Sequence, residues 1–425
     1  MSTIRRLSAL EILDSRGRPT VQATCELASS VSGTVSVPSG ASTGTAEALE
    51  LRDGDPKRYR GLGCRKAVAN ISDEMHEALV QRSFRDQAEL DQTIIELDGT
   101  HKKSRLGANA LLAVSLAFAR AVALERGVPL YQHFADVLEA PLHTLPRPTI
   151  NLFSGGKHAG DQVPIQDVLI VPVTVRTIAD AQAMAFEVYQ SAAELAHRKY
   201  GMRLLTADEG GLAPPFPNAE TMLEDAVEAI RAAGLKPGHD VALAIDVAAS
   251  HFYRDGGYHL GEGSVDSSAM IERLLGWLDQ YPIVSIEDGL AEDDWDHWPA
   301  LCARVAGRAL VLGDDLLCTN PARIRRAIAA GAVDALLLKV NQIGTLTEAA
   351  EAYQLARSAG WQVTISARSG ETEDNWLADV AVGWAGDQIK IGSITQSERL
   401  AKYNRLLAIE AATGLPMVEW PMSER

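Results

Sequence analysis

Cysteine is scarce in this sequence, with four residues among 425. Cys25, Cys64, Cys302 and Cys318 form no C-x-x-C pair and show no spacing typical of a zinc site. Scattered cysteines of this kind are typical of buried thiols in a reducing compartment. We therefore expect a cytoplasmic protein.

Positive charge and long apolar runs are also in short supply. Lys and Arg number 40 against 56 Asp and Glu, which gives a net charge of -16. Such a surface repels phosphate backbones and anionic lipid, so we expect neither a nucleic-acid nor a membrane partner. Glu11 and Asp14 interrupt any apolar stretch near the N-terminus, which disfavours a signal peptide. The most apolar helical segment, residues 111–124, is broken by Arg120 and is too short to span a bilayer, so we predict a core helix.

The length and composition that are present favour two globular domains. Hydrophobic residues make up 46% of the chain and charged residues 23%, as in ordinary soluble proteins. The pattern predicts an α+β domain over residues 1–138 and a second domain over 139–425, with the proline-rich stretch 141–148 at the boundary. In the first domain we expect strands at 20–27 and 33–37, a loop of small residues at 38–44, and helices at 64–80, 87–96 and 108–126.

The second domain shows short apolar runs that alternate with amphipathic helices, which indicates a parallel βα series. The runs read VALAID, IVSIED, LVLGD, ALLLK, QVTISAR and QIK, beginning at residues 241, 283, 310, 335, 362 and 388. Nearly continuous apolar strands are buried on both faces, as in a closed β/α barrel. A doubly wound open sheet is the competing fold. It is disfavoured because no glycine-rich dinucleotide turn follows any of these strands.

Charged residues stand where these apolar runs end. Asp246, Glu287, Asp314, Lys339 and Lys390 lie at the ends of five runs, and such ends meet at one mouth of a barrel. Each acid alone would more often cap the following helix. Three acids that face two lysines instead favour a divalent-metal site, because the acids would otherwise repel one another. Oxygen ligands suit Mg²⁺, and a partly desolvated lysine beside a cation has a lowered pKa and can act as a general base.

A series of short motifs runs along almost the whole chain. The motifs are SGASTG (39–44), ADEGG (207–211), SIED (285–288), GDDL (313–316), LLLKVNQIGT (336–345), RSGETED (368–374) and QIK (388–390), flanked by ILDSRG (12–17) and SERLAK (397–402). This ordered series resembles the enolase family. The resemblance implies an N-terminal capping domain on an enolase-type barrel that opens with two antiparallel-connected strands. It also implies Mg²⁺-dependent loss of water from 2-phosphoglycerate, a small anionic phosphorylated substrate, to give phosphoenolpyruvate. Sites of this superfamily are known to use a lysine or histidine base with Mg²⁺.

The resemblance implies a role for each residue that matches a family motif. Asp246, Glu287 and Asp314 would hold a first Mg²⁺, Lys339 would remove the proton next to the substrate carboxylate, and Glu209 would protonate the leaving hydroxyl. Arg368 and Ser369 would bind the phosphate, and Lys390 the carboxylate. Ser42 would lie on a first loop that closes over the site, and it would help bind a second Mg²⁺. His158, a further candidate catalytic residue, would sit on a second mobile loop. The family also implies a homodimer or an octamer.

Three positions depart from the family pattern. Ala367 stands where the family has histidine, Asp167 where a pocket glutamate is usual, and Gly289 where proline is usual. Asp167 could still reach the pocket through a small shift or a water. Ala367 can donate no hydrogen bond, so we expect a void large enough for an imidazole beside the phosphate pocket.

These departures leave alternatives open. One is a diverged enzyme resembling carboxyphosphonoenolpyruvate synthases, which would use nucleotide-activated phosphonoformate. Another is a catalytically impaired binding protein on the same fold, although the retained acids and lysines disfavour it. Lys157, on the second loop, could replace the missing cation at the phosphate, but a plain surface lysine is the simpler interpretation.

Overall fold

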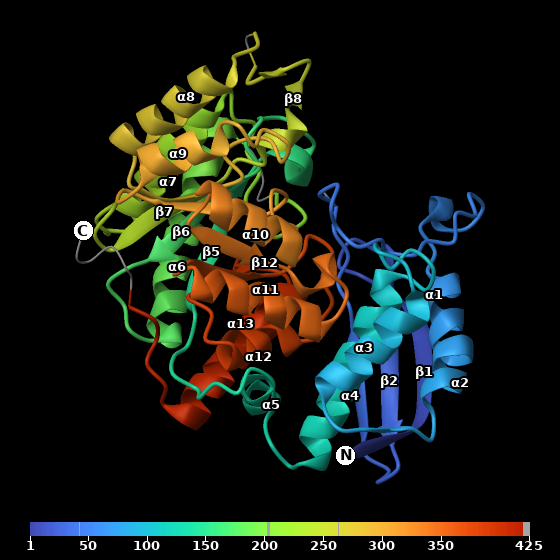
Figure 1. Ribbon diagram of the computed structural model, residues 1–425. Helices are drawn as coiled ribbons and strands as arrows, with labels where there is room; N and C mark the ends of the chain where they lie inside the picture. The colour runs from blue at the N-terminus through green and yellow to red at the C-terminus, as the bar shows by residue number, and fades with distance from the viewer. Residues whose placement is uncertain (42, 202–204, 262, 420–425) are drawn as a thin grey trace.

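The computed structural model describes residues 1–41, 43–201, 205–261 and 263–419 and shows two packed domains (Figure 1). The N-terminal domain has an antiparallel sheet in the order β3-β2-β1-β4. Its strands are β1 (Ser2–Leu13), β2 (Pro19–Leu27), β3 (Ser32–Ser36) and β4 (Ser83–Phe84). Its helices are α1 (Arg65–Asn70), α2 (His76–Leu79), α3 (Gln87–Asp98) and α4 (Ala108–Glu125), with α5 (Leu130–Val137) leading to the barrel.

The sequence predicts β2, β3, α3 and α4 of this domain. It does not predict β1, β4 or α5, and it predicts one helix where the structure has α1 and α2. The helix predicted over 64–80 is divided into α1 and α2 by a π-helical turn, Ile71–Met75. The sequence pattern does not predict β1 because Arg5 and Arg6 are adjacent and both exposed, and a bulge shifts the register between Ile4 and Arg6.

Helix α4 is the core helix that the sequence predicts. Within the described residues, Ala108–Arg126 is the one helix long and apolar enough to cross a membrane, yet 78% of that window is buried inside the protein. It packs against β2 and β3. Gly33 permits this close packing, since a Cβ there would lie 2.4 Å from the Ala121 backbone nitrogen.

The C-terminal domain is the predicted closed β/α barrel. Its eight strands follow the order β10-β11-β12-β13-β14-β5-β6-β7 around the barrel. They are β5 (Arg147–Ser154), β6 (Asp167–Pro172), β7 (Val241–Asp246), β10 (Ile283–Glu287), β11 (Leu310–Gly313), β12 (Ala335–Leu338), β13 (Gln362–Ser366) and β14 (Gln388–Gly392). The other pairs are parallel, but β6 is antiparallel to both β5 and β7, so the barrel opens as the family resemblance implies.

Helices surround the barrel, and a small hairpin extends from it (Figure 1). The helices are α6 (Ile178–Tyr200), α7 (Ala219–Ala232), α8 (Ser267–Gln280), α9 (Trp298–Val305), α10 (Pro321–Ala330), α11 (Leu346–Ser358), α12 (Trp376–Gly383) and α13 (Ser397–Thr413). The hairpin consists of β8 (Tyr253–Arg254) and β9 (Gly257–Tyr258). Several helices begin with the expected side-chain caps, such as Thr345, whose side chain accepts a hydrogen bond from Glu348 N.

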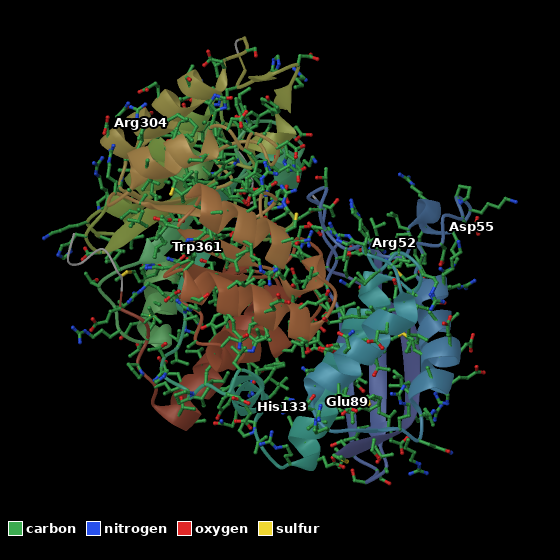
Figure 2. The ribbon with its side chains drawn as sticks, viewed as in Figure 1. Arg52, Asp55, Glu89, His133, Arg304 and Trp361 are labelled. Atoms are coloured by element: carbon green, nitrogen blue, oxygen red, sulfur yellow. The ribbon has the colours of Figure 1, made fainter. Side chains whose placement is uncertain are left out.

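Buried polar contacts join the two domains. Asp91 of α3 accepts hydrogen bonds from the backbone nitrogen (2.9 Å) and hydroxyl (2.6 Å) of Thr347, on the first turn of α11. Arg120 of α4 pairs with Asp374 of the barrel at 2.6 Å. Figure 2 labels Glu89 on α3 and His133 on α5, near the boundary between the domains, and Trp361 on the barrel. The first loop also reaches the barrel, where Ser39 and Gly370 exchange backbone hydrogen bonds.

Candidate active site

The predicted strand-end residues gather at one mouth of the barrel. Asp246 and Glu287 are the last residues of β7 and β10, Asp314 and Lys339 directly follow β11 and β12, and Lys390 lies within β14. Lys390 Nζ lies between two acids, 2.8 Å from Asp246 Oδ2 and 2.7 Å from Glu287 Oε2. Burial opposes ionisation of Asp246, but Lys390 outweighs it and holds the pKa of Asp246 at about 2. The sequence therefore identifies residues that the fold does bring together.

Lys339 forms an ion pair with Asp314. Gln342 Nε2 donates to the other oxygen, Asp314 Oδ1, at 2.8 Å. Burial alone would lower the pKa of Lys339, but Asp314 outweighs burial and raises it. This differs from the lowered pKa expected from the sequence, because that expectation places a cation beside the lysine whereas the structure places a carboxylate there.

Two tight groups of possible metal ligands occur among the described residues, and the predicted trio is neither of them. One group is Asp288, Asp314 and Asp315, and the other is His158, Asp167 and Glu209; within each, ligand atoms lie within 4.8 Å of one another. Asp288 accepts hydrogen bonds from the backbone nitrogens of Asp314 (2.9 Å) and Asp315 (2.8 Å). Burial and then Asp314 raise the pKa of Asp315 to about 8. The sequence pattern indicates no role for Asp288 or Asp315, although both lie in the motifs SIED and GDDL.

The chemistry of the mouth fits a divalent cation. Glu287 Oε1 is buried and has no hydrogen-bond partner among the described residues. Burial, and then the charge of Asp246, raise the pKa of Glu287 well above its ordinary value. A cation would satisfy this oxygen and remove the repulsion, and oxygen-only ligands suit Mg²⁺. Ser42, the remaining predicted ligand, lies outside the described residues.

His158, Asp167 and Glu209 form the second group, which faces Lys390. His158 Nδ1 lies 3.0 Å from Asp167 Oδ2, and its Nε2 lies 3.8 Å from Glu209 Oε1. Ser154 Oγ donates to the other Asp167 oxygen at 2.6 Å. Burial would lower the pKa of His158, but Asp167 and Glu209 outweigh burial and raise it to about 9. The shorter Asp167 side chain therefore does reach this cluster, because β6 is antiparallel and begins at the barrel mouth, where Asp167 pairs with Asp246.

Arg368 is held by a residue of the other domain. Its guanidinium donates to both carboxylate oxygens of Glu47, at 3.0 and 3.2 Å, and to Asn341 Oδ1 at 3.0 Å. Ser369 Oγ accepts a hydrogen bond from Arg16 at 3.1 Å. Glu47 is not predicted from the sequence, since a single acid eight residues past the start of the motif SGASTG carries no periodic signal.

The space beside Ala367 is smaller than the sequence predicts. Ala367, Ala41, Lys339, Arg368 and other site residues line a cavity of about 10 Å³, which is about the volume that one water molecule requires. The expected imidazole-sized void is therefore wrong for this arrangement, in which Ala41 of the first loop and other site residues line the small cavity beside Ala367.

Lys157 does not line this cavity. The side chain is exposed, whereas its neighbour His158 is buried and does line the cavity. This position matches the simpler interpretation of Lys157 as a surface lysine.

Two family descriptions match the chain. The enolase N-terminal domain matches residues 4–134, and the enolase C-terminal TIM barrel domain matches residues 142–418. Together the two matches span nearly the whole sequence and both domains of the fold. The matched barrel domain contains the acidic groups at the barrel mouth that could hold a metal ion.

Proposed function

The chain belongs to the enolase family, and from this premise we propose that it is a Mg²⁺-dependent lyase that converts 2-phosphoglycerate to phosphoenolpyruvate and water. The observation that carries the proposal is the arrangement of Lys339 and Lys390 against three buried acids at the barrel mouth. Buried cations and metal-binding acids set in one place are suited to stabilise the dianionic enediolate that forms when a proton is removed next to a carboxylate.

Lys339 is the proposed base. Asp314 now holds a proton on Lys339, because the ion pair favours the charged ammonium. Bound Mg²⁺ would supply positive charge at the substrate carboxylate. With Asp314 engaged as a metal ligand beside Asp246 and Glu287, its hold on the Lys339 proton would weaken, and Lys339 could accept the substrate proton.

Glu209 is the proposed donor to the leaving hydroxyl. Burial favours its neutral form, but His158 and Arg399 outweigh burial and lower its pKa. Glu209 therefore needs a proton source, and the neighbouring His158, with its raised pKa, carries one. Asn151 Nδ2 donates to Glu209 Oε2 at 3.0 Å and fixes the direction of this carboxylate.

Arg368 and Ser369 are proposed to bind the phosphate, and Lys390 the carboxylate. Arg368 is a bidentate partner of Glu47, which fixes its guanidinium but also offsets its charge. The Ala367 position adds no donor. We therefore propose a slow enzyme whose proton-abstraction residues are complete and whose phosphate contacts are reduced.

The test is an assay of the purified protein with 2-phosphoglycerate and Mg²⁺. Ultraviolet absorbance of the enol product should rise, and it should not rise after a chelator removes Mg²⁺. A folded, Mg²⁺-bound protein that gives no rise would sink the proposal. Membership of the family also supports a cytoplasmic protein that forms a homodimer or octamer. Light scattering would measure the molar mass of the assembly and so test the oligomeric state.

The second candidate is formation of carboxyphosphonoenolpyruvate from nucleotide-activated phosphonoformate. The loss of a donor at Ala367 favours it. The cavity of about 10 Å³ does not separate the two candidates, because neither substrate fits it unless the site rearranges. Incubation with CMP-activated phosphonoformate and 2-phosphoglycerate, followed by product analysis, separates the two. Phosphoenolpyruvate as the single product supports the lyase. No product here and none in the assay with 2-phosphoglycerate and Mg²⁺ alone would support a binding protein.

A further inference from the structure

Gln342 stands at the centre of a buried ring of hydrogen bonds around Lys339. Gln342 Nε2 donates to Asp314 Oδ1 at 2.8 Å, and Gln342 Oε1 accepts from Thr319 Oγ1 at 2.7 Å. Thr319 Oγ1 in turn accepts from the Lys339 backbone nitrogen at 2.9 Å. Asp314 closes the ring through its ion pair with the Lys339 side chain. Gln342 and Thr319 are fully buried, so water cannot replace these bonds without rearrangement.

The same amide reaches the phosphate side of the site. Gln342 Nε2 lies 3.5 Å from Glu47 Oε1, and Glu47 is the bidentate partner of Arg368. The Gln342 backbone carbonyl also accepts a hydrogen bond from Ala48 N at 2.8 Å. The Gln342 side chain therefore connects Asp314, the partner of Lys339, with Glu47, the partner of Arg368.

The backbone around Thr319 is held in an uncommon conformation. Cys318 and Thr319 have φ of 49° and 50°, in the left-handed region. This region is unfavourable for a β-branched residue such as threonine and persists only where surrounding contacts enforce it. Here it places the Thr319 hydroxyl between Lys339 and Gln342.

We propose that Gln342 is a positioning residue for the proton-transfer step: it fixes the Asp314 carboxylate against Lys339 and ties it to Glu47, the partner of Arg368. This role rests on the proposed function of the site. Gln342 is not proposed to touch substrate. It acts on a predicted metal ligand, and residues of this kind commonly change metal affinity or activity by about 10- to 100-fold when they are lost.

The test compares Gln342→Met with a matched control, Gln87→Met. Methionine keeps the volume of glutamine but removes its hydrogen bonds. Gln87 is also buried, and its Nε2 donates to the Asp91 carboxylate at 2.9 Å, far along the chain from the barrel mouth.

Both variants should lose thermal stability. Only Gln342→Met should weaken Mg²⁺ binding, measured by calorimetry without substrate, by about 10-fold. Its kcat for 2-phosphoglycerate should fall by on the order of 10- to 100-fold while KM changes less.

Thr319→Val supplies a second variant that breaks the ring at another point. If the ring acts as a unit, Thr319→Val should also weaken Mg²⁺ binding, and the double variant should lose little more than Gln342→Met alone. Mg²⁺ affinity equal to wild type in both single variants would overturn the proposal. If the wild-type protein binds Mg²⁺ but does not turn over 2-phosphoglycerate, the proposed function fails while the calorimetric comparison still decides the role of Gln342.

Discussion

At the scale of single residues, Asp314 serves several contacts at once. Its side chain pairs with Lys339 and accepts from Gln342, while its backbone nitrogen donates to Asp288. Such a residue is best understood through its partners, because the pKa of Lys339 depends on whether Asp314 faces the lysine alone or also faces a cation. For the same reason, a single acid at a strand end does not predict a metal site from the sequence, whereas several acids and lysines at neighbouring strand ends do.

The Ala367→His variant tests the phosphate side of the site. Restoring a donor should raise kcat for 2-phosphoglycerate, by up to about 3–4 kcal/mol of transition-state stabilisation if the imidazole is well placed. Because the cavity there is about 10 Å³, the imidazole fits only if groups that line the cavity shift. Side-by-side kinetics of the two proteins provide the measurement. An unchanged or lower kcat in a well-folded variant would indicate that the site is rebuilt for another substrate.

At the scale of elements, the sequence pattern predicts β2 and β3 and six of the barrel strands, β7 and β10 to β14. It does not predict β5 and β6, although both are fully buried. The runs VALAID (241–246) and IVSIED (283–288) match β7 and β10 to within one residue, since their apolar residues are nearly continuous. The antiparallel β6 is different, because its functional residue Asp167 is its first residue rather than its last. A rule based on the carboxyl ends of parallel strands cannot find it, and only the family resemblance does.

The contact of His158, on the loop between β5 and β6, with Asp167 should make the stability of the protein depend on pH. The folded pKa of His158, about 9, lies above its ordinary 6.5, so its contribution to stability is fully present below pH 6.5 and is lost as pH rises through 9. Asp167→Asn removes the acid that holds this proton. The difference in melting temperature between wild type and Asp167→Asn should therefore be largest near pH 6 and shrink toward pH 10. A difference that stays constant over that range would contradict the assignment.

The junction of α3 with α11 should respond to loss of Asp91. Asp91→Ala removes the acceptor of the Thr347 backbone nitrogen and hydroxyl, which should lower the free energy of unfolding by about 1–3 kcal/mol. Burial raises the folded pKa of Asp91 to about 6, so wild-type stability should fall as pH rises from about 4 through 6, and the variant should lack that slope. Chemical denaturation measures both. Gln92→Ala, on the exposed side of α3, is the control and should change stability by less than about 0.5 kcal/mol.

At the scale of the whole molecule, the site is complete only where the two domains meet. Glu47 comes from the N-terminal domain, whereas its partners Arg368 and Gln342 come from the barrel. The sequence predicts each domain from its own pattern. It cannot predict contacts between them, because no periodic signal connects residues some 300 positions apart.

Mg²⁺ should stabilise the folded protein as a whole. A ligand that binds only the native state adds about 2.7 kcal/mol when its concentration is 100 times its Kd. The melting temperature should therefore rise with Mg²⁺ concentration, measured by calorimetry. The rise should be reduced in Asp246→Asn, which removes a charge from the predicted ligands. An equal rise in that variant would place the cation elsewhere.

The central claim is that Lys339 removes the proton next to the substrate carboxylate, and exchange of that hydrogen tests it most directly. The protein is incubated with 2-phosphoglycerate and Mg²⁺ in deuterated water, and NMR follows deuterium incorporation at the carbon next to the carboxylate. Wild-type protein should exchange this hydrogen, and Lys339→Ala should lose exchange by on the order of 100-fold or more. An inert, folded, Mg²⁺-bound wild type, or equal exchange by Lys339→Ala, would contradict the account.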